Sequence, residues 1–232
     1  MSMPAPALDR PIAQQPVEVR TQFMTRVYMH LLVAIAGFIA VSYLLFVSGI
    51  AAAITNVVVG TNWLLILGGF MVVSWMANSM AIKARTPGAQ YGGFALLVVA
   101  NSLLFAAPLY AAAAIPGLEG SITLAAQISL IAFGVLSAIA IRSSKDFSFL
   151  RPLMIWGGIL ALVAIVGSVV FGVTLGLWFT LAMIAFAGGA ILYDTSKIYR
   201  SYPPHMVVPA AMSLFASIAL LFWYVLQLVM RR

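Results

Sequence analysis

The acidic side chain of Asp194 occupies an unusual place in the sequence. It follows an uncharged, mostly apolar run from Pro152 to Tyr193, and Lys197 and Arg200 come directly after it. If this run spans a membrane, the carboxylate lies near hydrocarbon, where a charge costs about 2.5–3.5 kcal/mol and usually faces the bundle interior or an aqueous path. The alternative is a surface ion pair with Lys197, which would contribute only a few tenths of a kcal/mol. Composition alone leaves both interpretations open.

The remaining acidic residues stand outside the apolar blocks of the chain. Asp9 and Glu18 belong to the polar N-terminal segment, and Glu119 lies in a predicted outer loop. Asp146 precedes the stretch "FSFL", where its side chain could cap the helix that follows. Asp194 is therefore the acidic residue with the best position for proton or cation chemistry.

No residue pattern typical of an enzyme occurs in the chain. The sequence contains no cysteine, and its two histidines, His30 and His205, are far apart near the ends of predicted helices. It contains no G-x-S-x-G, H-E-x-x-H or P-loop motif, and residues 207–229 contain no lysine for a retinal Schiff base. We therefore expect neither an enzyme nor a resident cofactor, and these residues offer no zinc site.

The composition predicts a helical membrane protein. Hydrophobic residues make up 64% of the 232 residues and charged residues 7%, whereas charged residues are about 25% of a soluble domain. The apolar residues form continuous blocks of about 20 residues, the length of a membrane-spanning helix. We predict an all-α integral membrane protein with spans at residues 28–50, 62–82, 91–113, 122–141, 153–172, 174–196 and 207–229.

Two breaks between these spans have an identifiable cause. The stretch Tyr202–His205 contains two consecutive prolines, which cannot continue a helix. Little polar sequence separates the fifth span from the sixth, so Gly172 and Gly176 are the predicted turn residues there.

The basic residues, which outnumber the acids to give a net charge of +7, predict an orientation. They precede the first span or follow the second, fourth and sixth: Arg10, Arg20, Arg26, Lys83, Arg85, Arg142, Lys145, Arg151, Lys197 and Arg200. The opposite loops contain no Lys or Arg, so the positive-inside rule places the N-terminus in the cytoplasm. This placement accounts for the charge without a nucleic-acid partner. Arg231 and Arg232 are the exception, because seven complete spans would place them outside.

The chain divides into two predicted parts. Residues 1–26 are polar and contain several prolines, which predicts a disordered cytoplasmic tail, and residues 27–232 form the seven-helix transmembrane domain. A basic, cysteine-free chain without a targeting segment suits a bacterial inner membrane. Whether the last segment crosses the membrane completely stays open from the sequence.

Three stretches resemble the motifs of one known family. The stretch "ILYDTSKI", Ile191 to Ile198, resembles the I-L-[YF]-D-T-x-x-I motif of the Bax inhibitor-1 family, also called the transmembrane BAX inhibitor motif family. The stretch "KDFSFL", Lys145 to Leu150, resembles the loop before the fifth helix, and "NSLLFAAPLY", Asn101 to Tyr110, resembles the third helix. The resemblance covers nearly all of residues 25–230. It implies a seven-helix bundle with the last helix near the centre.

The resemblance also implies a function. Family members are associated with pH-sensitive calcium leak, in which carboxylates on the sixth and seventh helices share protons and gate the pore. Two close carboxylates resist double ionisation, so protonation can act as a switch. Asp194 matches the first carboxylate, but "SLFASIAL", Ser213 to Leu220, aligns with S-L-Y-x-D-x-x-N and has Ser217 at the second Asp position. Because serine does not ionise, the carboxylate pair is incomplete.

Two functions follow as hypotheses. The first is a pH-modulated cation leak channel, passing calcium, with Asp194 as the pH-sensing residue and candidate calcium ligand, Ser217 opposite it, and Thr195 and Lys197 in support. The second is a stress-related membrane modulator that binds other membrane proteins, such as a quality-control protease, through the tail at residues 1–26. The expected partners are the lipid bilayer, cations and, for the second hypothesis, membrane proteins.

Overall fold

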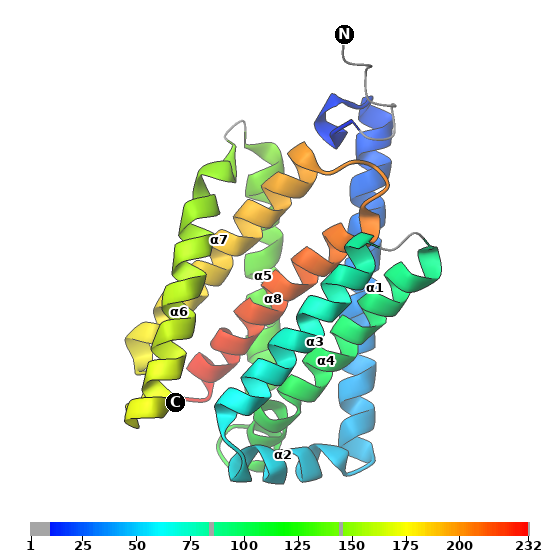
Figure 1. Cartoon of the computed structure of the whole chain (residues 1–232). Coiled ribbons are helices and arrows are strands. Elements are labelled where there is room, and N and C mark those ends of the chain that lie inside the picture. Colours follow the sequence, from blue (N-terminus) through cyan, green and yellow to red (C-terminus); the bar gives the residue numbers. More distant parts are fainter. Residues whose placement is uncertain (1–9, 84–85, 144–145, 232) are drawn as a thin grey trace.

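The structure is a computed structural model that describes residues 10–83, 86–143 and 146–231. Asp9, Arg85, Lys145 and Arg232, which are named above, lie outside these residues. Within the described part of the chain, α-helices and two short 3₁₀ helices (η) form a bundle (Figure 1). The elements are η2 (Ile12–Gln14), α1 (Val17–Val47), α2 (Ile50–Gly60), α3 (Trp63–Lys83), α4 (Pro87–Ala114), α5 (Ser121–Arg142), η3 (Phe147–Leu150), α6 (Arg151–Phe171), α7 (Leu177–Ser201) and α8 (Val207–Val229).

Seven of the described helices are long and apolar enough to cross a membrane: α1, α3, α4, α5, α6 (continuing from η3), α7 and α8. This confirms the predicted all-α, seven-span membrane protein. Gly172 has a φ of +66° and ends α6, and Gly176 is the residue before α7, so both predicted turn glycines bound that break. The two prolines of Tyr202–His205 lie between α7 and α8, as predicted.

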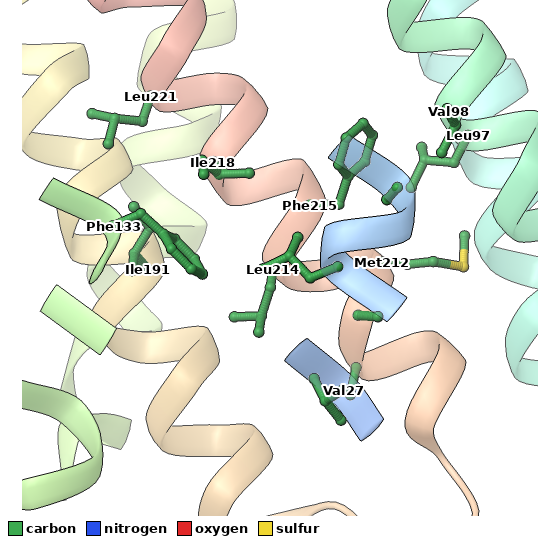
Figure 2. Close-up of a cluster of buried hydrophobic side chains, with 14 of the residues drawn as sticks. Val27, Leu97, Val98, Phe133, Ile191, Met212, Leu214, Phe215, Ile218 and Leu221 are labelled. Carbon is green, nitrogen blue, oxygen red and sulfur yellow. The ribbon is translucent and has the colours of Figure 1, made fainter. Parts of the chain in front are cut away.

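The last helix, α8, lies near the centre of the bundle, as predicted. It packs against α1, α3, α4, α5 and α7. Residues 207–229 include no charged side chain, so α8 can be buried on several faces at once. Figure 2 shows Met212, Leu214, Phe215, Ile218 and Leu221 of α8 among Val27 of α1, Leu97 and Val98 of α4, Phe133 of α5 and Ile191 of α7. In contrast, α6 has no buried residue and lies at the edge of the bundle beside α7 (Figure 1).

The C-terminal end of α8 contacts the turn between α6 and α7. The guanidinium Nη2 of Arg231 donates a 3.1 Å hydrogen bond to the carbonyl of Leu175, in the turn between α6 and α7. This turn lies at the opposite end of the bundle from the N-terminal segment (Figure 1). The C-terminal end of α8 therefore lies at the end of the bundle opposite the N-terminal segment, and Arg231 remains the exception to the charge pattern.

The prediction that residues 1–26 form a disordered tail is wrong for residues 12–26. α1 begins at Val17, and Ile12 is completely buried. The N–H of Ile12 donates a 2.8 Å hydrogen bond to the carbonyl of Tyr202, and Arg20 Nη2 donates to the Tyr199 hydroxyl at 3.1 Å. The prediction failed because the segment is mostly polar, and its apolar Ile12 packs against the α7–α8 connection.

The short helix α2 was not predicted. The predicted spans end at residue 50 and resume at residue 62, so residues 51–61 were left as a connection although they are apolar. Gly49 separates α1 from α2 with a φ of +76°, a left-handed conformation that glycine adopts without a steric cost. α2 then lies across the end of the bundle, away from the N-terminal segment (Figure 1).

The helices α3 and α4 approach each other closely at Gly93. A Cβ atom at this position would lie 2.5 Å from the carbonyl oxygen of Ala77 and 3.1 Å from the backbone nitrogen of Ala81. Both alanines are buried and one turn apart, which is the spacing that lets membrane helices pack with their backbones in contact. This interface therefore has no room for a side chain at residue 93.

Candidate functional site

Asp194 and Ser217 are in direct contact between α7 and α8. The hydroxyl of Ser217 donates a 2.5 Å hydrogen bond to Oδ2 of Asp194. Asp194 is half-buried, and the Ser217 side chain is 5% exposed. The two residues that the sequence placed together are thus joined in the bundle interior, and the hydroxyl takes the place expected for a second carboxylate.

The position of Asp194 follows from the burial pattern of α7. Ala187, Ile191, Thr195 and Ile198 are completely buried and recur at intervals of three or four residues, so they form one face of the helix. Asp194 is three residues after Ile191 and lies at the flank of this face, which brings its carboxylate to α8. The pattern of α7 fixes which side of the helix is buried, and the packing of α8 on that side supplies the partner.

Thr195 contacts a different helix from the one that Asp194 contacts. Its side chain is fully buried, and its hydroxyl lies 3.4 Å from the hydroxyl of Ser137 on α5. Thr195 therefore joins α7 to α5, while the neighbouring Asp194 joins α7 to α8. The sequence motif suggested a supporting role for Thr195, but Ser137 as its partner was not foreseen.

Lys197 is exposed and lies beside aromatic rings. Its ammonium group is 5.7 Å from the ring centroid of Tyr193 and 5.7 Å from that of Tyr202. A cation at this distance is attracted to the face of an aromatic ring. Of the two interpretations of Asp194, the geometry favours an interior carboxylate bonded to Ser217 over a surface ion pair with Lys197.

The loop before α6 is tied to α7 close to Asp194. Asp146 accepts hydrogen bonds from the N–H of Ser148 at 2.9 Å and from its hydroxyl at 2.7 Å, so it caps η3 as predicted. These bonds to Ser148 lower the pKa of the Asp146 carboxyl below its ordinary value. The N–H of Phe147 donates to the hydroxyl of Ser196 at 3.3 Å. Ser196 thus holds this loop two residues from Asp194, a contact that sequence reasoning missed because the partners are distant in the chain.

Asp194 does not belong to a metal-binding cluster of acidic and histidine side chains. Among the described residues, no group of three or more His, Cys, Asp or Glu residues lies close enough to hold a metal ion. Calcium usually takes 6–8 oxygen ligands, several of them carboxylates. The role of Asp194 as a calcium ligand stays a prediction.

The sequence matches the model of a known protein family. The sequence model of the family described as "Inhibitor of apoptosis-promoting Bax1" matches residues 20–232. The match covers nearly the whole chain and includes both Asp194 and Ser217. No curated protein matches the chain. With a family match over all seven candidate spans, the chain belongs to the Bax inhibitor-1 family of multi-pass membrane proteins.

Proposed function

We propose that the chain is a proton-modulated cation leak channel, with calcium as the principal cation. The bond between Asp194 and Ser217 holds the closed arrangement in this proposal. Family membership supports a membrane modulator or a channel-type role. The observation that carries the choice of a channel is the hydrogen bond between α7 and α8 at the lone acidic side chain of the bundle interior.

An ionised Asp194 makes this bond strong. Hydrogen bonds to charged groups contribute about 1.5–3 kcal/mol, roughly twice the value of neutral ones. The bond joins α7 to the helix that packs against five others, so any displacement of α8 from α7 rearranges the bundle centre. Breaking this bond is a local change, but in the proposal it alters the cation path through the whole bundle.

A proton on Asp194 removes the charge and with it part of the bond strength. Lys197 is three residues after Asp194 on the same helix, and α8 has no Asp, Glu, Lys, Arg or His between Val207 and Val229. Because lowering the pH adds the proton, cation flux rises as the pH falls.

The incomplete carboxylate pair affects the steepness of the response. Two coupled carboxylates titrate as a pair, with their proton-binding steps separated by mutual repulsion. Asp194 has a serine opposite it, so the site binds at most one proton. Its pH response is therefore shallower than that of a carboxylate pair. When α8 moves away, the freed carboxylate is a hard oxygen site that attracts calcium.

The proposal includes an orientation. We place the N-terminus in the cytoplasm of a bacterial inner membrane, because the basic residues near the ends of α3, α5 and α7 lie at the same end of the bundle as the N-terminal segment. Asp194 is then on the cytoplasmic half of its helix, and cations leave through that half.

Purified protein in liposomes that contain a calcium-sensitive dye would test the channel. We expect calcium flux that increases from pH 8 to pH 6, and a flux in Asp194→Asn that no longer depends on pH over this range. Asp146→Asn is the control, because Asp146 is an acid outside the spans and asparagine caps a helix equally well. An unchanged pH dependence in Asp194→Asn, or no flux from the wild-type chain, would contradict the proposal.

The second hypothesis, a modulator that binds other membrane proteins, rested on the missing second Asp and on the polar tail at residues 1–26. Residues 12–26 fold onto the bundle through Ile12 and Arg20, so a partner would meet a folded surface at these residues rather than a free tail. Strong calcium flux from the isolated chain would separate the channel from this alternative.

A further inference from the structure

A second feature of the bundle is a groove that Asp194 does not line. An apolar groove of about 510 Å³ runs between α1, α4, α5 and α8. α1 contributes residues 35–46, near its end at Val47, and α5 contributes residues 122–130, near its start at Ser121. The groove therefore occupies the half of the bundle nearer to α2. Asp194 and Ser217 are not among its lining residues.

The groove opens on the surface that spanning helices present to lipid. Its deepest residues, Phe105 and Phe215, are 2% and 3% exposed. At its edge, Ile39 of α1 is 60% exposed and Leu130 of α5 is 49% exposed. In a membrane such apolar edges are surrounded by acyl chains rather than by water. A molecule that enters the groove from this side comes from the bilayer.

Two serine hydroxyls in the lining have no hydrogen-bond partner. Ser42 on α1 is 8% exposed and Ser129 on α5 is 2% exposed, and no described residue accepts from or donates to either hydroxyl. Several other serines bond to a carbonyl of their own helix, as Ser48 does to Leu44 and Ser102 does to Val98. A buried hydroxyl without a partner is destabilising, because it has lost its hydrogen bonds to water. Ser42 and Ser129 are thus placed to bond to a ligand that carries oxygen.

We propose that this groove binds the acyl chain of a bilayer phospholipid, and that the ester carbonyl of the chain accepts hydrogen bonds from Ser42 and Ser129. The apolar lining matches the hydrocarbon chain, and the volume lies within the range of ligand sites, about 300–1,000 Å³. The two hydroxyls match the ester, which is the polar group nearest to the hydrocarbon in a phospholipid.

The depth of the hydroxyls agrees with an ester group. At about 1.5 Å per residue, Ser42 lies about 8 Å before the end of α1 at Val47. α2 lies across this end of the bundle, the position of a helix at the membrane interface (Figure 1). Ser129 lies about 12 Å after the start of α5 at Ser121. Both hydroxyls are therefore below the interface, near the level at which lipid esters meet the hydrocarbon core. Water alone would leave the long apolar part of the groove without an occupant.

The test uses the full chain in vesicles of phosphatidylglycerol and phosphatidylethanolamine that contain a trace of phosphatidylcholine with a photoactivatable group on one acyl chain. After illumination, mass spectrometry locates the labelled peptides. We expect label in residues 35–46 and 122–130 above the level on the exposed face of α6. The double variant Ser42→Ala/Ser129→Ala should lose about fivefold or more of this label, the effect of losing a hydrogen bond of about 1 kcal/mol.

Two further variants keep the result interpretable. Ser74→Ala removes another buried, unpartnered hydroxyl, but on α3 and outside the groove, so it should leave the label unchanged. Ala126→Phe fills the groove and should displace the label while the protein retains its thermal unfolding temperature. If the double variant is labelled as strongly as the wild type, the proposal is overturned. Labelling of Ala126→Phe as strong as that of the wild type would overturn it too. Competition by oleate but not by unlabelled phospholipid would also overturn it, because the site would then hold a free fatty acid.

Discussion

Ser217 of α8 donates its hydroxyl hydrogen to Asp194 of α7 over 2.5 Å, and so joins the central helix to its neighbour. The family resemblance places a second carboxylate at residue 217, and this chain has a hydroxyl there. A serine can bond to an ionised carboxylate without sharing its charge. The contact is therefore attractive when Asp194 is ionised, where two carboxylates would repel each other.

Ser217→Ala should open the channel and lower stability. Removing the hydroxyl leaves a half-buried carboxylate without this partner, which costs about 1.5–3 kcal/mol near neutral pH. We expect higher calcium flux at pH 8 and a flatter pH response, measured in dye-loaded liposomes, together with a lower thermal unfolding temperature. Ser213→Ala is the matched control, because Ser213 bonds to Pro209 of its own helix, one turn earlier on α8. Identical behaviour of the two variants would show that the Ser217 bond does not control the flux.

Gly93→Ala should destabilise the bundle, whereas Gly92→Ala should not. A Cβ atom at Gly93 would meet the α3 backbone at 2.5 Å, so the two helices must separate, and we expect a loss of about 1–3 kcal/mol. At Gly92 the nearest atom is the flexible end of Met80 at 3.5 Å, and alanine favours the helix by about 0.5–1 kcal/mol. Thermal unfolding in detergent would measure both. A tolerated alanine at residue 93 would mean that α3 and α4 pack less closely than described.

Ile12→Ala should release the N-terminal segment from the bundle. The side chain is completely buried, and its loss should cost about 2 kcal/mol, the low end for a buried isoleucine because the segment can relax. Hydrogen exchange should then increase at residues 10–16, and the N–H of Ile12 should lose the protection that its bond to Tyr202 provides. Gln14→Ala changes an exposed neighbour and should leave exchange unaltered. Fast hydrogen exchange of this segment in the wild type would contradict the folded arrangement and support the predicted disordered tail.

Asp146→Ala should weaken the turn at η3 in a pH-dependent way. Because the two bonds from Ser148 hold the pKa of Asp146 below its ordinary value, the cap stabilises the turn above that value, about 3.9. The contribution disappears as the pH falls through the lower pKa of the folded state. At pH 7 we expect exchange of the Ser148 amide to rise by a few-fold in the alanine variant and hardly at all in Asp146→Asn. No difference between wild type and alanine at pH 7 would show that the cap is not formed.

Particular elements show what could be read from the sequence. The spans were predictable because an apolar block of sufficient length has few alternatives to a helix in a membrane. The prolines at the α7–α8 break and the glycines at the α6–α7 turn act through their own backbone geometry, so they needed no tertiary information. α2 and the folded segment at residues 12–26 were missed for opposite reasons. α2 is as apolar as the span before it, and the N-terminal segment is polar except for the side chains that it buries.

The amino-acid sequence by itself determined that this chain forms seven apolar helices, because in hydrocarbon each backbone N–H and C=O must be satisfied within its own helix. It also predicted that Asp194 is the acid near hydrocarbon, and the family resemblance aligned Ser217 with the expected second carboxylate. Only the tertiary structure decided that these two side chains bond to each other, that Thr195 turns instead to Ser137, and that Ser42 and Ser129 lack partners. The rotation of each helix about its axis depends on simultaneous packing against several others, and one segment's pattern does not contain that information.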